Sequence, residues 1–250
     1  METCQNCGAE NPGRYCSVCG QKVLPRITLK YIIDNTSGHI LSYDNSFLHT
    51  VFALIIRPGV VLTEFMEGKR AHYFEPFKFL LLTITLTSIA FIGLPGMDSI
   101  WDIQAQQAGP SININGNEAG KLFQKMLRQY FTIFLFLTIP TGAIINSLLF
   151  RKLKYNLAEH LVVITYITGI TNLINIPMYL LTFLDRKIFM ITAIVWSTFP
   201  YIYSLWYYIK VYKENVFVSL IKIILASTIN LIIYAFTLGG MFLLYYKFFK

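Results

Sequence analysis

The chain has 250 residues, of which 55% are hydrophobic and only 14% are charged, and its formal net charge is +8. A soluble globular domain carries about 25% charged residues, because ionic side chains cover its water-facing surface. The shortage of charge argues against a soluble protein and indicates lipid as the main solvent. On a membrane protein the positive charge faces anionic lipid head groups, so the bilayer is the expected partner and nucleic acid is not.

The chain begins with two Cys-x-x-Cys-Gly repeats, which contain all 4 cysteines: Cys4, Cys7, Cys16 and Cys19. Such a repeat is typical of a tight knuckle with two converging thiolates, and four thiolates are the ligand set of a closed structural Zn²⁺ site. We therefore predict one structural zinc ion in a ribbon over residues 1–25. Two disulfides would need an exported N-terminus, a rubredoxin-type iron site usually has knuckles further apart, and a thioredoxin-like pair needs a βαβ context. The polar composition of this segment predicts no cleavable signal peptide.

Residues 26–76 mix polar and apolar side chains without a run long enough to cross a bilayer. Apolar residues recur there at the spacing of one helical face: Ile33, Ile40, Phe47, Leu48, Val51, Phe52 and Ile55. After Pro58–Gly59 we expect a short helix over residues 60–67, ended by Gly68. These amphipathic helices either lie along the membrane surface or form a cap packed on the spans.

Five later segments have the roughly 20 apolar residues that a membrane-spanning helix needs. They cover about 77–94, 130–150, 157–184, 188–209 and 218–245, with a polar loop over 98–128. The expected fold is therefore an all-α integral membrane protein. Its five transmembrane helices (residues 77–250) follow the interfacial region (26–76) and the N-terminal ribbon (1–25).

Basic residues predict the orientation of these spans. The segments on the N-terminal side of the membrane hold about twice as many as the opposite ones: Arg14, Lys22, Arg26, Lys30, Arg57, Lys69, Arg70, Lys78, Arg151, Lys152, Lys154, Lys210, Lys213 and Lys222, against Lys121, Lys125, Arg128, Arg186, Lys187, Lys247 and Lys250. The positive-inside rule then predicts a cytoplasmic N-terminus and an external C-terminus. Trp206, Tyr207 and Tyr208 fit an aromatic anchor at the inner interface.

Two groups of ionisable residues fall on the predicted cytoplasmic surface. Arg57, Glu64, Lys69 and Arg70 precede the first span, and Glu159 with His160 begins the third. The first group could bind a lipid phosphate or a soluble partner, or be ordinary solvated charge. The alternative for Glu159–His160 is an interfacial hydrogen-bonding pair that fixes the depth of the helix.

Inside the predicted spans the notable polar residues are Asn146, Asn172, Asn175 and Asn230, which we interpret as contacts between helices. No Asp, Lys or Arg lies in the middle of a span, which argues against an ion-coupled transporter or a proton pump but leaves a passive pore open. The chain has no Walker loop, GxSxG or HExxH motif. An enzyme is therefore the less favoured class, without being excluded.

Several motifs follow the ribbon: Arg57-Pro-Gly59, Glu67-Gly-Lys-Arg70, Pro76-Phe-Lys-Phe79 and Ala158-Glu-His-Leu-Val162. With them the chain resembles a bacterial, Bacteroidetes-type family of zinc-ribbon multi-pass membrane proteins catalogued as a domain of unknown function. The resemblance implies an inner-membrane location and brings no established activity. It favours a role for Arg57, Glu64, Lys69, Arg70, Glu159 and His160, which lie within or close to the motifs.

Two functions are compatible with this sequence. The first is a non-enzymatic membrane adaptor or sensor, whose cytoplasmic ribbon docks a protein partner. The alternative is a lipid- or solute-handling membrane protein, either a transporter or an enzyme, with its site at the cytoplasmic leaflet.

Overall fold

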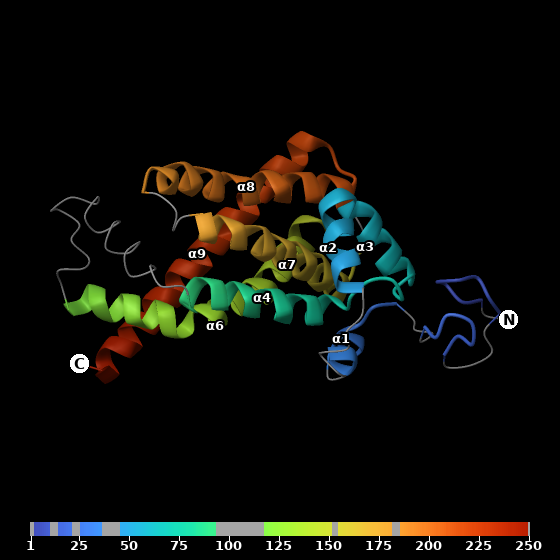
Figure 1. Ribbon diagram of the computed structural model, residues 1–250, viewed down its shortest axis with the longest axis horizontal. Coiled ribbons are helices and arrows are strands. Elements are labelled where there is room, and N and C mark those ends of the chain that lie inside the picture. Colours follow the sequence, from blue (N-terminus) through green and yellow to red (C-terminus); the bar gives the residue numbers. More distant parts are fainter. Residues whose placement is uncertain are drawn as a thin grey trace.

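The computed structural model describes residues 3–10, 15–21, 26–36, 46–93, 118–151, 155–181 and 186–249. This part of the chain is helical after its N-terminal segments, and in place of strands it has an isolated antiparallel bridge between Thr3 and Glu10. Three short helices come first: α1 (Leu29–Thr36), α2 (Ser46–Ile56) and α3 (Pro58–Glu67). Longer helices then form one bundle (Figure 1): α4 (Pro76–Gly93), α6 (Glu118–Leu149), α7 (Leu157–Leu181), α8 (Arg186–Tyr212) and α9 (Val216–Phe249).

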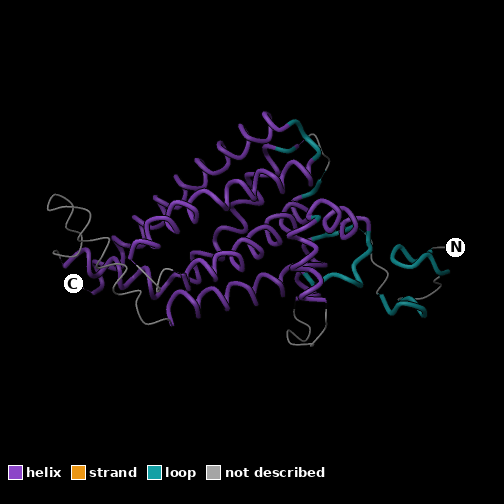
Figure 2. Tube along the Cα trace, turned by 45° about the horizontal axis from the view of Figure 1, so that its top comes forward, coloured by secondary structure: helices purple, strands orange, loops and turns teal. Residues whose placement is uncertain are grey.

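The helix α7 is central to the bundle. It packs against α4, α6 and α8, and the short helices α1 and α2 also contact it. Gly169 of α7 lies so close to α4 that a Cβ atom there would be 2.6 Å from the Phe79 ring. Phe79, Tyr166 and Ile170 are fully buried at this contact. The core of the protein therefore includes the α4–α7 interface. Figure 2 shows the helical character of the described chain after its N-terminal loops.

The bundle has one end, here called the capped end, at which α4, α7 and α9 begin and α6 and α8 finish. The Phe150 ring stacks on the Tyr212 ring with centroids 4.1 Å apart, and Lys222 Nζ of α9 lies 4.4 Å from the Phe150 centroid. The Tyr212 hydroxyl in turn lies 3.0 Å from His160 Nδ1 of α7. The helices α1, α2 and α3 pack at the same end, and the N-terminus lies beyond them (Figure 1). Consecutive long helices thus run in alternating directions.

Two helices of the described chain are long and apolar enough to cross a membrane. The first segment is Leu157–Pro177 of α7, with a mean hydropathy of 1.4, and 67% of the residues in its apolar 18-residue stretch are buried. The second segment is Val216–Lys247 of α9, with a mean hydropathy of 2.3, and only 11% of the residues in its corresponding 18-residue stretch are buried. The helix α9 therefore presents an apolar surface that the rest of the described chain leaves uncovered. Such a surface marks contact with a membrane or with another protein.

The long helices cover the segments that were expected as spans, and their limits differ most from the expected ones at the second span. Residues 94 and 182–184 of the expected spans lie outside the described residues. That span was expected from residue 130 and the residues before it as a loop, whereas α6 begins at Glu118. Residues 118–128 are rich in helix-favouring Glu, Ala, Lys, Leu, Gln and Met. Met126 is fully buried, and the Phe123 ring packs edge-on against Phe242 of α9. The polar residues of segment 118–128 therefore lie on one side of an amphipathic helix and do not form a loop. The rest of the expected loop, residues 98–117, lies outside the described residues.

The short helix expected after Pro58–Gly59 is confirmed as α3. It ends at Gly68, whose φ of 102° is left-handed and favours glycine. The amide of Lys69 donates to the Glu64 carbonyl (2.8 Å), and the amide of Gly68 donates to the Phe65 carbonyl (3.3 Å). These two hydrogen bonds form a Schellman cap, and they satisfy carbonyls that a helix end otherwise leaves unpaired.

The single apolar face expected for α2 is wrong. Phe47 and Val51 pack against the core beside the buried residues Ala53 and Leu54, but Leu48, Phe52 and Ile55 are exposed. Apolar side chains therefore occupy both faces of α2. One face packs on the bundle, as the cap arrangement requires, and the other is exposed.

The expected aromatic anchor is also wrong for two of its three residues. Tyr207 and Tyr208 are buried in the bundle, where the Tyr207 hydroxyl donates to the Val163 carbonyl (2.9 Å) and the Tyr208 hydroxyl accepts from Asn146 Nδ2 (2.6 Å). Successive residues of a helix point about 100° apart, so three neighbours cannot share one interface. Trp206 alone of the three is partly exposed.

Candidate functional site

Residues 3–10 and 15–21 fold into two similar knuckles. In the first, the Cys4 amide donates to the Ala9 carbonyl and the Gly8 amide donates to the Cys4 carbonyl, both at 2.8 Å. The second repeats the pattern at Cys16 and Gly20. Gly8 and Gly20 have φ values of 76° and 69°, a left-handed conformation that other residues adopt only at a cost. This explains why each Cys-x-x-Cys pair is followed by glycine.

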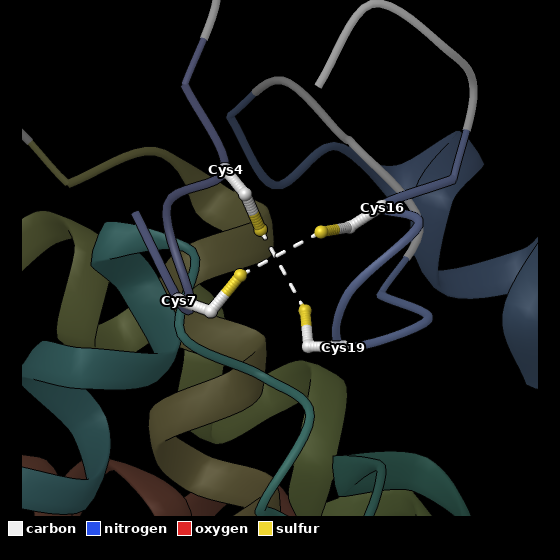
Figure 3. Close-up of side chains that lie close together, drawn as sticks. All are labelled: Cys4, Cys7, Cys16 and Cys19. Carbon is white, nitrogen blue, oxygen red and sulfur yellow. Dashed lines mark hydrogen bonds between the residues drawn. The ribbon is translucent and has the colours of Figure 1, made fainter. Parts of the chain in front are cut away.

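The two knuckles bring the four thiols together (Figure 3). Their Sγ atoms all lie within 4.8 Å of one another, with 3.7 Å between Cys4 and Cys19 and 3.6 Å between Cys7 and Cys16. Four sulfurs placed tetrahedrally at about 2.3 Å from one ion would be about 3.8 Å apart. The cluster therefore fits a metal ion held by four thiolates, with no position left for a substrate.

Backbone amides favour the thiolate form of two ligands. The Cys19 amide, followed by that of Val18, lowers the pKa of Cys16 to about 6 by hydrogen bonding. The Cys7 amide is the main cause of a lowered pKa at Cys4. Since the thiolate is the metal-binding form of cysteine, these amides favour metal binding at Cys4 and Cys16. The Ala9 amide acts in the same direction on Cys7, but burial and the neighbouring thiols raise the pKa of Cys7 to about 12.

The ribbon is attached to the loop between α3 and α4. Gln21 Nε2 donates to the Gly68 carbonyl (2.6 Å), and Gln21 Oε1 accepts from the amides of Arg70 (2.9 Å) and Ala71 (3.0 Å). Gln5 of the first knuckle covers the other side of Gly68, where an added Cβ atom would lie 1.8 Å from Gln5 Oε1. Both knuckles thus support the Gly68–Ala71 turn.

Glu159 holds the start of α7. Its carboxylate accepts from the Asn156 amide (2.8 Å), and its own amide donates to Asn156 Oδ1 (2.9 Å), which forms a capping box. Arg26 donates to both Glu159 oxygens at 2.7 Å, and Asn156 Nδ2 donates to the Ile27 carbonyl (3.0 Å). Glu159 therefore joins the segment after the ribbon to α7, in line with the hydrogen-bonding alternative.

His160 and Arg70 also have partners within the fold. The buried His160 ring contacts Tyr212. The Arg70 guanidinium lies over the Tyr31 and Phe65 rings, 4.8 Å and 5.4 Å from their centroids, and its Nε donates to the Phe65 carbonyl (2.9 Å). Among the described residues no hydrogen bond or ion pair joins Arg70 to Glu159 or His160. Each of these three side chains is therefore held by a different set of neighbours within the fold.

The other three candidates line a groove between the start of α3 and the end of α8, which we call the α3–α8 groove. It has a volume of about 520 Å³. Its charged lining residues are Arg57, Glu64, Glu67, Lys69, Lys210 and Lys213, and Trp206 and Val60 add apolar surface. Basic side chains outnumber acidic ones there, so the groove favours an anion.

The Arg57-Pro-Gly59 motif shapes this groove. Arg57 is the N-cap residue of α3 without a side-chain cap bond, and Pro58 fits the first turn because it lacks an amide hydrogen. Gly59 touches α8: a Cβ atom there would lie 2.6 Å from the Lys210 carbonyl oxygen. The motif thus brings the positive end of the α3 dipole to the lysines of α8.

Glu64, which lines the groove, is hydrogen-bonded within the fold. The Tyr73 hydroxyl donates a hydrogen bond to its carboxylate. Burial, and then this contact, raise the pKa of Tyr73 to about 12, so the tyrosine remains a donor at neutral pH. With one carboxylate oxygen accepting this bond, the groove's anion-binding groups are Arg57, Lys69 and the lysines of α8.

The sequence alone did not identify Trp206, Lys210 and Lys213 as site residues. Lys210 lies in the last turn of α8, and Lys213 is the residue directly after this helix, with a φ of 51°. Two lysines this close in sequence at a helix end are a signal of local positive charge. This signal does not identify Arg57 as their neighbour, because the two segments are joined only through the folded bundle.

The model of a protein family of unknown function, DUF3667, matches residues 44–87. The match supports the resemblance to a family of unknown function, and it covers α2, α3 and the start of α4, including Arg57, Glu64 and Lys69. It does not extend to the cysteines or to α7. No curated protein and no solved structure matches the chain.

Proposed function

We propose that this chain is a five-span protein of the bacterial inner membrane that acts, without catalysis, as a receptor for anionic phosphate head groups of lipids. The observation that carries the proposal is the α3–α8 groove. The capped end and the ribbon then lie in the cytoplasm, where the thiolate cluster holds one structural Zn²⁺.

Five stretches without Asp, Glu, Lys or Arg support the membrane assignment. They lie between Lys78 and Asp98, Arg128 and Arg151, Glu159 and Asp185, Lys187 and Lys210, and Lys222 and Lys247. Each is close to or above the roughly 20 residues of a membrane crossing. The uncovered apolar surface of α9 also favours lipid contact. The bias of basic residues towards the capped end favours a cytoplasmic location for it.

The chemistry of the groove favours a phosphate ester over other anions. Lysine and arginine donate to phosphate oxygens. In the first turn of α3 the amides of Val60 and Val61 donate to the Arg57 carbonyl, so these basic side chains are the main donors to the phosphate. In this topology the groove lies at the inner leaflet, whose anionic lipids attract basic residues. Trp206 beside the lysines suits this depth, because tryptophan is enriched at membrane–water interfaces.

A second function, that of an adaptor, is favoured by the outer surface of the ribbon. Tyr15 and Val18 are 58% and 72% exposed on the second knuckle. Exposed apolar side chains beside a rigid metal site suit a cytoplasmic protein partner. Val18→Asp would disrupt such a contact and leave the groove intact, so the two functions are separable.

The lipid proposal is tested by reconstituting the protein in nanodiscs and measuring bound phosphatidylglycerol by native mass spectrometry after extraction. The double variant Lys210→Gln, Lys213→Gln should bind about thirtyfold more weakly, since each lysine near an anionic surface contributes about 1 kcal/mol. Inorganic phosphate, added in excess to the wild type, distinguishes recognition of free phosphate from recognition of a lipid.

The control is the double variant Lys30→Gln, Arg151→Gln. It removes the same charge at exposed positions of the capped end, outside the groove. Its affinity should stay within about twofold of the wild type. An equal loss in both double variants would reduce the groove to diffuse surface charge and refute the proposal.

A further inference from the structure

A second hollow, the bundle cavity, lies between α6, α7, α8 and α9 and shares no lining residue with the α3–α8 groove. It has a volume of about 180 Å³. Hydroxyl and amide side chains face it from all four helices, and they include Asn146, Thr168, Thr171, Ser204, Ser227 and Asn230. None of its described lining residues is Asp, Glu, Lys, Arg or His. The cavity is therefore polar and uncharged.

Asn230 leaves an acceptor in this cavity unpaired. Its Nδ2 atom donates to the Ala226 carbonyl of its own helix (3.1 Å), whereas its Oδ1 atom is buried without a hydrogen-bond partner among the described residues. Asn146, expected like Asn230 to join two helices, does so through Tyr208. Buried acceptors are nearly always satisfied by protein or by water, so Asn230 Oδ1 offers a position for a donor from a water molecule or a ligand.

An apolar groove between α8 and α9 adjoins the bundle cavity. Its volume is about 400 Å³, and it shares Tyr201, Ile223 and Ser227 with the cavity. The side chains along it are mostly aliphatic, and Ile202 and Ile224 are 64% and 57% exposed at its edges. The polar cavity thus has an apolar side opening towards the surrounding medium.

The length of this groove suits a hydrocarbon chain in one leaflet. Its lining residues on α9 extend from Leu220 to Leu231, which corresponds to about 16 Å along a helix that rises 1.5 Å per residue. Half the thickness of the hydrocarbon core is about 15 Å. The groove is therefore about as long as the hydrocarbon chain of a lipid in one leaflet.

We propose that the bundle cavity and the α8–α9 groove form one binding site for a neutral lipid, with a hydroxyl-bearing head in the cavity and a hydrocarbon chain in the groove. The head is uncharged because no lining side chain could compensate a charge at membrane depth. Its hydroxyl donates to Asn230 Oδ1. The site is independent of the α3–α8 groove, which recognises an anion.

The test uses the purified full-length protein in nanodiscs with a monoacylglycerol that carries a diazirine in its acyl chain. A fatty acid with the same photoreactive chain is the matched probe with a charged head. After irradiation, mass spectrometry should locate the monoacylglycerol label within residues 201–205 and 220–231. The fatty acid should label these segments about tenfold less.

Two variants connect the label to the site. Asn230→Leu removes the unpaired acceptor at nearly constant volume, and Ser227→Leu fills the wall that the cavity and the groove share. Both should reduce monoacylglycerol labelling of the site about tenfold, the effect of one lost hydrogen bond or of a blocked entrance. Thr237→Leu, on the same helix outside both hollows, should leave it unchanged.

Asn230→Leu also separates binding from folding. Because it removes a buried acceptor that has no partner, it should leave the melting temperature equal or higher while labelling falls. Labelling that persists in both variants, or that spreads evenly along the exposed side of α9 with either probe, would overturn the proposal and indicate ordinary contact with bulk lipid.

Discussion

At the scale of single residues, Gln21 carries much of the connection between the ribbon and the bundle. Its side chain makes three hydrogen bonds to the Gly68–Ala71 turn, two of them to the amides of Arg70 and Ala71. These amides follow the end of α3, so they make no hydrogen bond within that helix. If the four thiolates hold the proposed Zn²⁺, loss of the ion would disorder the knuckles, and the turn would lose its hydrogen bonds to Gln21.

We predict that Gln21→Ala keeps the metal but loosens the turn. Elemental analysis should find one zinc per chain, as in the wild type, while amide exchange at Arg70 and Ala71 becomes about tenfold faster, the effect of about 1.4 kcal/mol. Cys4→Ser should lose the zinc and accelerate the same two amides. Protected amides in the zinc-free variant would show that the ribbon does not support the turn.

The thiolate cluster could be predicted because its information is local: two pairs with their glycines fix two knuckles. Glu159 could not be assigned in this way. Its partner Arg26 is 133 residues away, and only the fold brings the two together. For the same reason the sequence did not predict that Lys210 lies close to the Arg57-Pro-Gly59 motif. The sequence indicated which residue types were unusual, but not which of them were already paired.

At the scale of elements, close approach between helices depends on small residues. In a lipid solvent, helix association relies on van der Waals packing, which glycine improves by letting backbones approach. Gly169 serves this role between α7 and α4, where the Phe79 ring occupies the space of its missing side chain. Gly239 and Gly240 differ, because a Cβ atom at either meets nothing within 4 Å.

We predict opposite effects of alanine at these two kinds of glycine. Gly169→Ala should lower the stability of the purified protein by about 1–3 kcal/mol, because the new methyl group overpacks the α4–α7 contact. Gly239→Ala should raise it by up to about 1 kcal/mol, since alanine favours a helix and the space is open. Thermal unfolding in one detergent measures both. A gain in both variants would show that the α4–α7 contact is loose.

The helical elements could be predicted from the apolar runs and their Pro and Gly boundaries, as α3 and its Gly68 cap illustrate. The start of α6 could not, because residues 118–128 are polar on average, and the burial of Met126 and the contact of Phe123 with Phe242 arise only in the folded chain. The face of α2 was obscured for a related reason. A helix with apolar side chains on both faces has no polar side that marks its orientation.

At the scale of the whole molecule, the exposed surface of α9 is the feature that distinguishes a membrane protein from a soluble helical bundle. Phe236 is 78% exposed and lies near the middle of the uncharged stretch between Lys222 and Lys247. Phe217, 69% exposed, lies one residue after the start of the same helix at the capped end. In water these two positions would be equivalent, whereas in a bilayer they lie at different depths.

Phe236→Lys and Phe217→Lys therefore test the membrane architecture directly. A lysine at the bilayer centre costs about 2.5–3.5 kcal/mol, so Phe236→Lys should reduce the amount of folded protein in the membrane fraction severalfold. A lysine at position 217 would reach the head groups and should be tolerated. Folded protein is measured by size-exclusion chromatography of a fluorescent fusion after mild solubilisation. Equal tolerance of both lysines would mean that α9 faces water or a protein partner, and the five-span arrangement would have to be abandoned.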